Sequence, residues 1–108
     1  MSAVKLTELM KKRQLLSFEL FPPKTDKGMA KLPETIEHLN EFRPDYISVT
    51  YGAGGGNVGA NREVCRMVRE SGTVPVTHFT VIRNTKEGIR DQLETYLSEG
   101  VDHILALR

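Results

Sequence analysis

The strongest constraint on the fold is the alternation of strand-like and helix-like segments along the chain. Aromatic, aliphatic and β-branched runs predict strands at residues 17–23, 46–51, 74–82 and 101–107, the first of them ended by a double proline. Between these runs, apolar residues recur at helical spacing. Each strand-plus-helix unit is about 30 residues long, which predicts parallel strands joined by right-handed crossovers.

The first two predicted helices flank the first strand. A short amphipathic lead-in helix is expected over residues 6–14. The second helix follows a polar, turn-like segment at residues 24–28, and Pro33 is expected in its first turn, where a missing N–H does no harm. The buried stripe of this helix is expected to consist of Leu32, Ile36, Leu39 and Phe42.

The third and fourth helices are also predicted from apolar stripes. Cys65 lies within the third, which indicates a small core residue rather than a nucleophile, and Gly72 is expected to end that helix. Asn84 is expected to cap the fourth helix in a capping box with Glu87. The stripes consist of Val64, Met67 and Val68 in the third helix and of Ile89, Leu93, Tyr96 and Leu97 in the fourth.

Side-chain alternation along the strands separates the sheet into two predicted faces. The apolar face, expected beneath the helices, consists of Phe18, Leu20, Ile47, Val49, Phe79, Val81, Leu105 and Leu107. The other face becomes polar toward the carboxyl ends of the strands and consists of Ser17, Glu19, Ser48, Thr50, His78, Thr80, Ala106 and Arg108. An open doubly wound sheet would be apolar on both faces. The pattern therefore favours an α/β fold of the (β/α)8 TIM-barrel type, with the first four strands and three intervening helices present as a half barrel.

Length and composition narrow the class of protein. A chain of 108 residues with 27% charged residues and a net charge of +1 suits a single α/β domain over residues 1–108. The nearly balanced charge does not indicate a basic surface for binding nucleic acid. No apolar run has the length of a membrane span. A single cysteine excludes an internal disulfide framework and fits a reducing compartment, so we expect a cytoplasmic protein.

Single residues of the polar face are open to more than one interpretation. Glu19 is a carboxylate in an apolar strand, which indicates either a functional group or a side chain that reaches solvent at a strand end. His78 is either part of a site or a hydrogen-bonded interior residue. The glycines of residues 52–59 lack the spacing of a dinucleotide or P-loop fingerprint. The shared position of these groups near the carboxyl ends of the strands is what favours a site.

Four motifs resemble the methylenetetrahydrofolate reductase family in order and spacing. They are Ser-Phe-Glu-Leu-Phe-Pro-Pro at 17–23, Ser-Val-Thr-Tyr-Gly-Ala-Gly-Gly at 48–55, His-Phe-Thr at 78–80 and His-Ile-Leu-Ala-Leu-Arg at 103–108. The resemblance implies a flavin-dependent TIM barrel with FAD at the carboxyl ends of the strands. NADH or NADPH would reduce the flavin, which would then reduce the folate substrate, 5,10-methylenetetrahydrofolate, to 5-methyltetrahydrofolate.

The resemblance also implies roles for particular residues. Glu19 matches the family's catalytic glutamate, the general acid that helps to open the imidazolidine ring of the substrate. The positions that match flavin contacts are Thr50, Tyr51, Ala53, His78, Leu107 and Arg108. No metal ligand is implied.

A half barrel would leave sheet edges and apolar surface open to another chain. We therefore expect a fragment of a longer reductase, a homo-oligomer or other pairing that supplies the missing half barrel, or a small open domain without activity. Two functions remain: a flavin-binding half of a reductase, and a non-catalytic α/β module that serves assembly.

Overall fold

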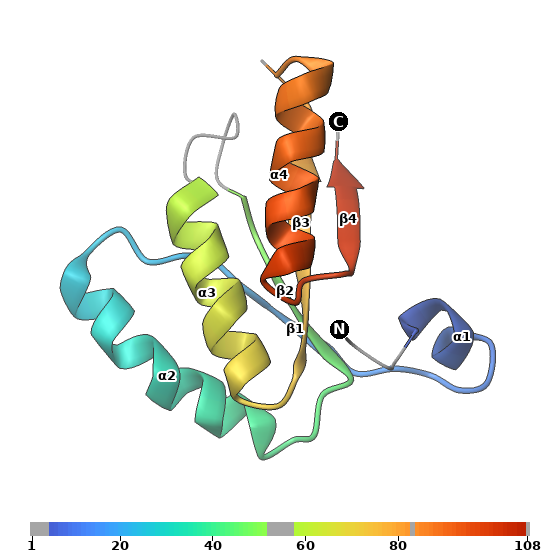
Figure 1. Cartoon of the computed structure of the whole chain (residues 1–108). Coiled ribbons are helices and arrows are strands. Elements are labelled where there is room, and N and C mark those ends of the chain that lie inside the picture. Colours follow the sequence, from blue (N-terminus) through green and yellow to red (C-terminus); the bar gives the residue numbers. More distant parts are fainter. Residues whose placement is uncertain (1–4, 52–57, 83, 108) are drawn as a thin grey trace.

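The computed structural model describes residues 5–51, 58–82 and 84–107. Four strands form one parallel sheet in the order β1-β2-β3-β4 (Figure 1), which confirms the predicted α/β topology. The strands are β1 (Ser17–Leu20), β2 (Tyr46–Val49), β3 (Val74–Thr80) and β4 (Ile104–Leu107). Each strand pairs with the one before it in sequence, as expected for successive βαβ units.

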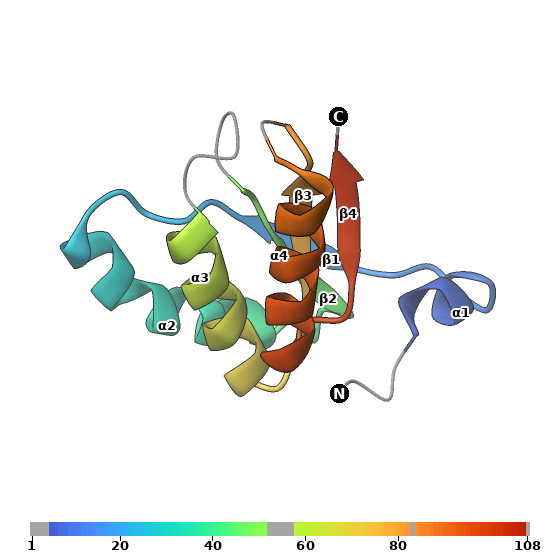
Figure 2. The same cartoon turned by 45° about the horizontal axis from the view of Figure 1, so that its top comes forward.

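Three helices alternate with the strands and a shorter one precedes them. They are α1 (Leu6–Met10), α2 (Asp26–Asn40), α3 (Val58–Glu70) and α4 (Lys86–Ser98). Figures 1 and 2 show α2, α3 and α4 side by side on one side of the sheet. We call the side of the sheet beneath these three helices the helix face and the other side the open face.

The hydrophobic core lies between the helix face and the three helices. Ile47 and Val49 of β2 and Val64 of α3 are fully buried, and Tyr96 of α4 is 1% exposed. Phe79 of β3 stands edge-on to two tyrosine rings, with centroid distances of 5.7 Å to Tyr51 and 6.3 Å to Tyr96. Cys65 is also buried in this cluster, which confirms the core position predicted for it.

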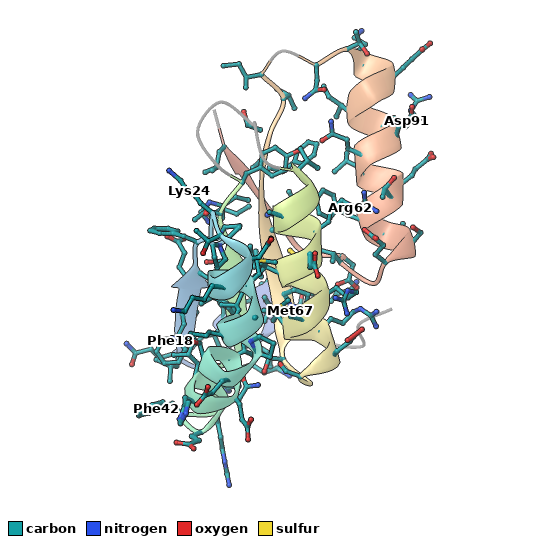
Figure 3. The ribbon with its side chains drawn as sticks, turned by 90° about the vertical axis from the view of Figure 1, so that its left-hand side faces the viewer. Phe18, Lys24, Phe42, Arg62, Met67 and Asp91 are labelled. Atoms are coloured by element: carbon teal, nitrogen blue, oxygen red, sulfur yellow. The ribbon has the colours of Figure 1, made fainter. Side chains whose placement is uncertain are left out.

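The second helix begins earlier than predicted. Thr25 caps α2, because its hydroxyl accepts the backbone N–H of Gly28 at 3.0 Å. Pro33 therefore lies inside the helix and not in its first turn, so that one intrahelical hydrogen bond is missing there. Phe42 lies beyond the end of α2 and is 66% exposed, packed edge-on to Phe18 at 6.1 Å (Figure 3) rather than in the core.

The first and fourth helices also differ from expectation. α1 ends at Met10, short of the predicted limit at residue 14. Thr85 rather than Asn84 caps α4 and accepts the N–H of Gly88. Leu93 and Leu97 are 38% and 59% exposed, because they lie on the outer surface of α4 and not against the sheet.

The fourth strand presents the opposite side chains to those predicted. Partners in a parallel ladder share a face, and Leu105 pairs with His78 while Leu107 pairs with Thr80. These leucines therefore lie on the open face, and Ala106 shares the helix face with Phe79. The sequence Ile-Leu-Ala-Leu is apolar at every position, so its pattern does not distinguish the two faces. Val81, also assigned to the core, lies beyond the end of β3 and is 52% exposed.

Candidate active site

Three polar side chains from adjacent strands meet on the open face. Glu19 of β1 is the register partner of Ser48 of β2, and the Ser48 hydroxyl donates to Glu19 Oε1 at 3.2 Å. His78 of β3 reaches across the small serine, so that its Nε2 lies 2.9 Å from the same oxygen. The structure thus brings together Glu19 and His78, which the sequence placed on one face.

The ring nitrogen of His78 has an unusual environment. His78 is 9% exposed, and its Nε2 atom is buried without a hydrogen-bond partner among the described residues. Its contact with Glu19 has the distance of an ion pair but not the alignment of a hydrogen bond. A buried polar atom without a hydrogen bond is costly, and the contact with the Glu19 carboxylate is what offsets that cost here.

The Glu19 side chain is 47% exposed, so its carboxyl group is reachable from the open face. One of its oxygens is engaged by Ser48 and His78, which fixes the orientation of the carboxyl group. A carboxyl group held in this way can donate a proton to, or accept one from, a molecule bound over the sheet.

A cavity of about 540 Å³ adjoins this cluster between the open face and α1. Leu6 and Met10 of α1 form one wall, and Glu19, Ser48 and Leu105 contribute to the other. Tyr46, the first residue of β2, also lines it, so the cavity extends toward the amino ends of the strands. The cavity therefore lies toward the amino ends of the strands from Glu19 and Ser48. Thr80 lies in the opposite direction, at the carboxyl end of β3.

The predicted flavin contacts do not all lie on the open face. Thr50 directly follows β2, is half-buried and donates its N–H to the Leu20 carbonyl at 3.0 Å. Tyr51 is 3% exposed, and its ring packs in the helix-side core with its hydroxyl donating to Gln92. Leu107 lies on the open face and is 42% exposed. Ala53 and Arg108 lie outside the described residues.

Two further polar residues lie beside this site that the sequence pattern does not single out. Strand alternation places Ser48 on the polar face but does not show that it is the partner of Glu19. Asn61 of α3 is completely buried, and its side-chain amide donates to the carbonyls of Val49 and Thr50. Asn61 precedes Val64 and Val68 at helical spacing, so a polar residue within the apolar stripe was the available signal.

The remaining titratable groups of the core do not suggest chemistry. Burial raises the pKa of the Cys65 thiol to about 12, which opposes a role as a nucleophile. Burial also raises the pKa of the Tyr51 phenol. Within the described ranges, no cluster of three or more metal-ligating side chains is found, and no helix is long and apolar enough to cross a membrane.

The sheet is parallel, with helices on one face and a carboxylate and an imidazole on the other. This arrangement corresponds to part of the wall of a (β/α) barrel. The sequence agrees with this class of protein: residues 5–108 match the methylenetetrahydrofolate reductase family. The chain belongs to that family.

Individual relatives cover most of this chain. It is 34% identical over 94 residues to the 5,10-methylenetetrahydrofolate reductase of Pectobacterium carotovorum subsp. carotovorum and 35% identical over 94 residues to that of Salmonella typhimurium. It is 37% identical over 93 residues to methylenetetrahydrofolate reductase (NADH) 1 of Arabidopsis thaliana. The matches span 86% of this chain but 32% of each bacterial relative, and 85% of this chain but 16% of the plant relative.

Proposed function

We propose that this chain supplies the flavin-binding half barrel and the acid of a methylenetetrahydrofolate reductase. The reaction is the reduction of 5,10-methylenetetrahydrofolate to 5-methyltetrahydrofolate, with FAD as cofactor and NADH or NADPH as reductant. The observation that carries the proposal is the position of Glu19 on the open face, in contact with Ser48 and His78. Family membership supports the choice of reaction.

Glu19 is the proton donor in this proposal. Its carboxyl proton passes to the leaving nitrogen of the imidazolidine ring while the carbon–nitrogen bond breaks and its electron pair stays on that nitrogen. The carbon is left as an iminium, which accepts hydride. The Ser48 hydroxyl, 3.2 Å from Glu19 Oε1, then stabilises the resulting carboxylate by a hydrogen bond. The partial exposure of Glu19 leaves its carboxyl group accessible to the substrate.

The described residues include some, but not all, of the positions predicted to contact a flavin. His78 is a predicted flavin contact on the open face, and a polar atom of the flavin would share its Nε2 with Glu19 Oε1, which lies 2.9 Å away. Leu107 adds exposed apolar surface on the same face, and Thr50 lies close by at the end of β2. The Tyr51 side chain is held in the core, which leaves its backbone for any flavin contact. Once bound there and reduced by NADH or NADPH, the flavin would supply the hydride. Ala53 and Arg108 remain predicted contacts.

The test separates flavin binding from folate chemistry. The purified chain is titrated with FAD and followed by quenching of flavin fluorescence. Bound flavin is then reduced with NADH or NADPH, and its reoxidation by methylenetetrahydrofolate is recorded. We expect Glu19→Gln to retain flavin binding and reduction but to lose the folate-dependent step, while Ser17→Ala, an exposed change on the same strand, retains all three. Equal loss of both half-reactions in Glu19→Gln would refute the acid role.

A second function is favoured by the exposure of β4. All four of its residues are exposed, including Leu105 and Leu107 on the open face. Such apolar surface on a strand is typical of a site covered by another chain. In this alternative the chain is a non-catalytic α/β module that assembles with a second copy or a separate half barrel. A chain that binds no FAD at saturating concentration, yet self-associates in sedimentation, would favour assembly over catalysis.

A further inference from the structure

The side-chain amide of Asn61 is the centre of a buried polar network. Asn61 lies in the first half of α3 and has no exposed surface. Its Nδ2 donates to the carbonyls of Val49 at 3.3 Å and Thr50 at 3.0 Å. Its Oδ1 accepts from the hydroxyls of Thr77, at 3.0 Å, and Tyr96. Both donors and both acceptor positions of the amide are therefore in use.

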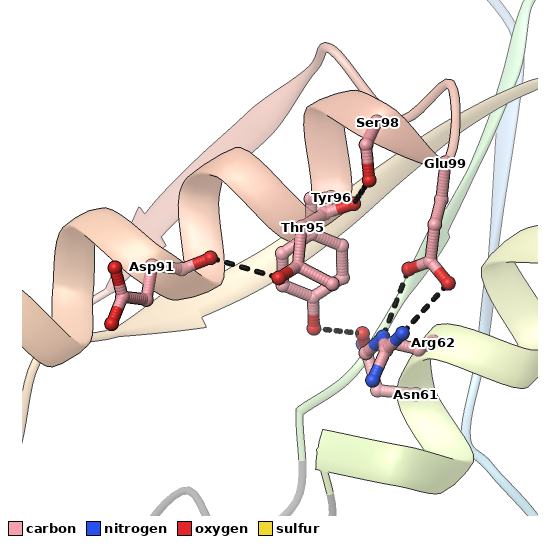
Figure 4. Close-up of polar contacts among 7 residues, drawn as sticks. All are labelled: Asn61, Arg62, Asp91, Thr95, Tyr96, Ser98 and Glu99. Carbon is pink, nitrogen blue, oxygen red and sulfur yellow. Dashed lines mark hydrogen bonds and ion pairs between the residues drawn. The ribbon is translucent and has the colours of Figure 1, made fainter.

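These contacts fix which way the amide points. A flipped amide would turn its oxygen toward two carbonyl oxygens and its NH2 group toward Thr77 and Tyr96, so the two donor bonds to β2 would be lost. Figure 4 shows Tyr96 reaching Asn61 from α4, beside the paired side chains of Arg62 and Glu99. Arg62 donates two hydrogen bonds to Glu99, both of 2.8 Å, which join α3 to the end of α4.

Asn61 holds two successive peptide groups at the carboxyl end of β2. The carbonyl of Val49 and the N–H of Thr50 belong to one planar peptide group. Asn61 binds that carbonyl, and the Leu20 carbonyl of β1 accepts that N–H at 3.0 Å. The peptide plane is thus fixed from both sides, between α3 and the strand that carries Glu19. The bond from Asn61 to the Thr50 carbonyl holds the next peptide group from one side.

We propose that Asn61 is a positioning residue that sets the backbone of Thr50 relative to β1 and thereby shapes the cofactor side of the site. The proposal rests on the proposed function, since it takes the ligand at this end of β2 to be FAD. Asn61 does not touch the open face; it acts through the Val49 and Thr50 carbonyls. Loss of its donors would let the end of β2 move while the rest of the sheet stays paired through its own ladder.

The test compares the donor side of the amide with its acceptor side. Asn61→Leu removes the donors to Val49 and Thr50 together with the acceptor. The matched control, Thr77→Val with Tyr96→Phe, removes both hydroxyls that bind Oδ1 but keeps the two donors. If Asn61→Leu does not fold, Asn61→Asp takes its place in the comparison, because it exchanges the NH2 group for an oxygen and keeps the Oδ1 acceptor. Two quantities are measured: amide hydrogen exchange at Thr50 and the affinity for FAD.

We expect about tenfold faster exchange at the Thr50 amide and about tenfold weaker FAD binding in the Asn61 variant than in the control at equal thermal stability. The amides within β1, which neither variant alters, should exchange alike in both. Equal exchange at Thr50 in the two variants would overturn the positioning role. If the parent chain binds no FAD but Thr50 exchange responds as expected, the proposed function fails and Asn61 still positions β2. Unchanged FAD affinity in the Asn61 variant would overturn its link to the cofactor.

Discussion

Replacing Phe79 by leucine should destabilise the chain through a small number of identifiable contacts. The Phe79 ring is 4% exposed and stands edge-on to Tyr51 and Tyr96. Leucine keeps an apolar side chain but is smaller than phenylalanine, so a modest loss of packing adds to the effect. Both edge-on contacts disappear, at about 0.5–1.5 kcal/mol each. We therefore expect the free energy of unfolding to fall by about 2 kcal/mol.

Urea and thermal unfolding followed by circular dichroism would measure this change, because the chain contains no tryptophan to report by fluorescence. A loss of about 2 kcal/mol corresponds to a decrease in Tm of about 8–16 °C for a domain of this size. Val81→Ala is the matched control. Val81 was predicted to share the apolar face with Phe79, but it is 52% exposed, so its truncation should cost less than about 0.5 kcal/mol. A loss below about 0.5 kcal/mol for Phe79→Leu would refute the role of the ring contacts, and a loss of about 2 kcal/mol for Val81→Ala would refute the exposed placement of Val81.

Three further predictions concern the ion pair between Arg62 and Glu99, the thiol of Cys65 and the exposed leucines of β4. Hydrogen bonds from Arg62 hold the pKa of the Glu99 carboxyl group below its ordinary range. The pair therefore stabilises the folded chain at pH values above the pKa of Glu99 in the unfolded chain, which is about 4.3. This stabilisation is lost as the pH falls through the lower pKa that Glu99 has in the folded chain. Glu99→Gln should therefore remove part of the acid dependence of unfolding, and cost at most about 1 kcal/mol at neutral pH because both side chains are over one third exposed. Cys65, whose pKa burial raises to about 12, should react with a thiol reagent in urea but not in the native chain; fast native reaction would contradict its burial. Leu105→Lys with Leu107→Lys should change stability by less than about 0.5 kcal/mol per site and weaken any self-association seen in sedimentation, whereas a large loss of stability would mean that these side chains are packed.

The sequence predicts the succession of elements better than their limits. Strand-like runs such as 46–51 stand out because they are β-branched and aromatic between turn residues. The apolar stripe predicts too late a start for α2, because the stripe begins at Leu32 whereas the helix begins after its cap, Thr25. The sequence predicts the wrong face for β4 because four consecutive apolar residues show no alternation, and only the pairing with β3 determines which side chains share a face.

The candidate site was predictable where it depends on strand alternation. Glu19 and His78 were placed on one face, and they meet at 2.9 Å. Alternation says nothing about contacts through the backbone, so it could not reveal that Asn61 binds the carbonyls at the end of β2. Nor could it show that the Tyr51 side chain turns into the core, because the residue lies just beyond the strand.

The contact between α1 and the segment before β4 has a consequence for the order of folding. The N–H of Leu6 donates to His103 Nε2 at 3.4 Å, across 97 positions of the chain, whereas neighbouring strands of the sheet are always successive in sequence. Each strand can therefore add to the growing sheet through local contacts that close short loops, but α1 can dock only after His103 has been placed. During synthesis on the ribosome the open face would remain uncovered by α1 until the segment before the fourth strand emerges, so the docking of α1 would report the arrival of that segment.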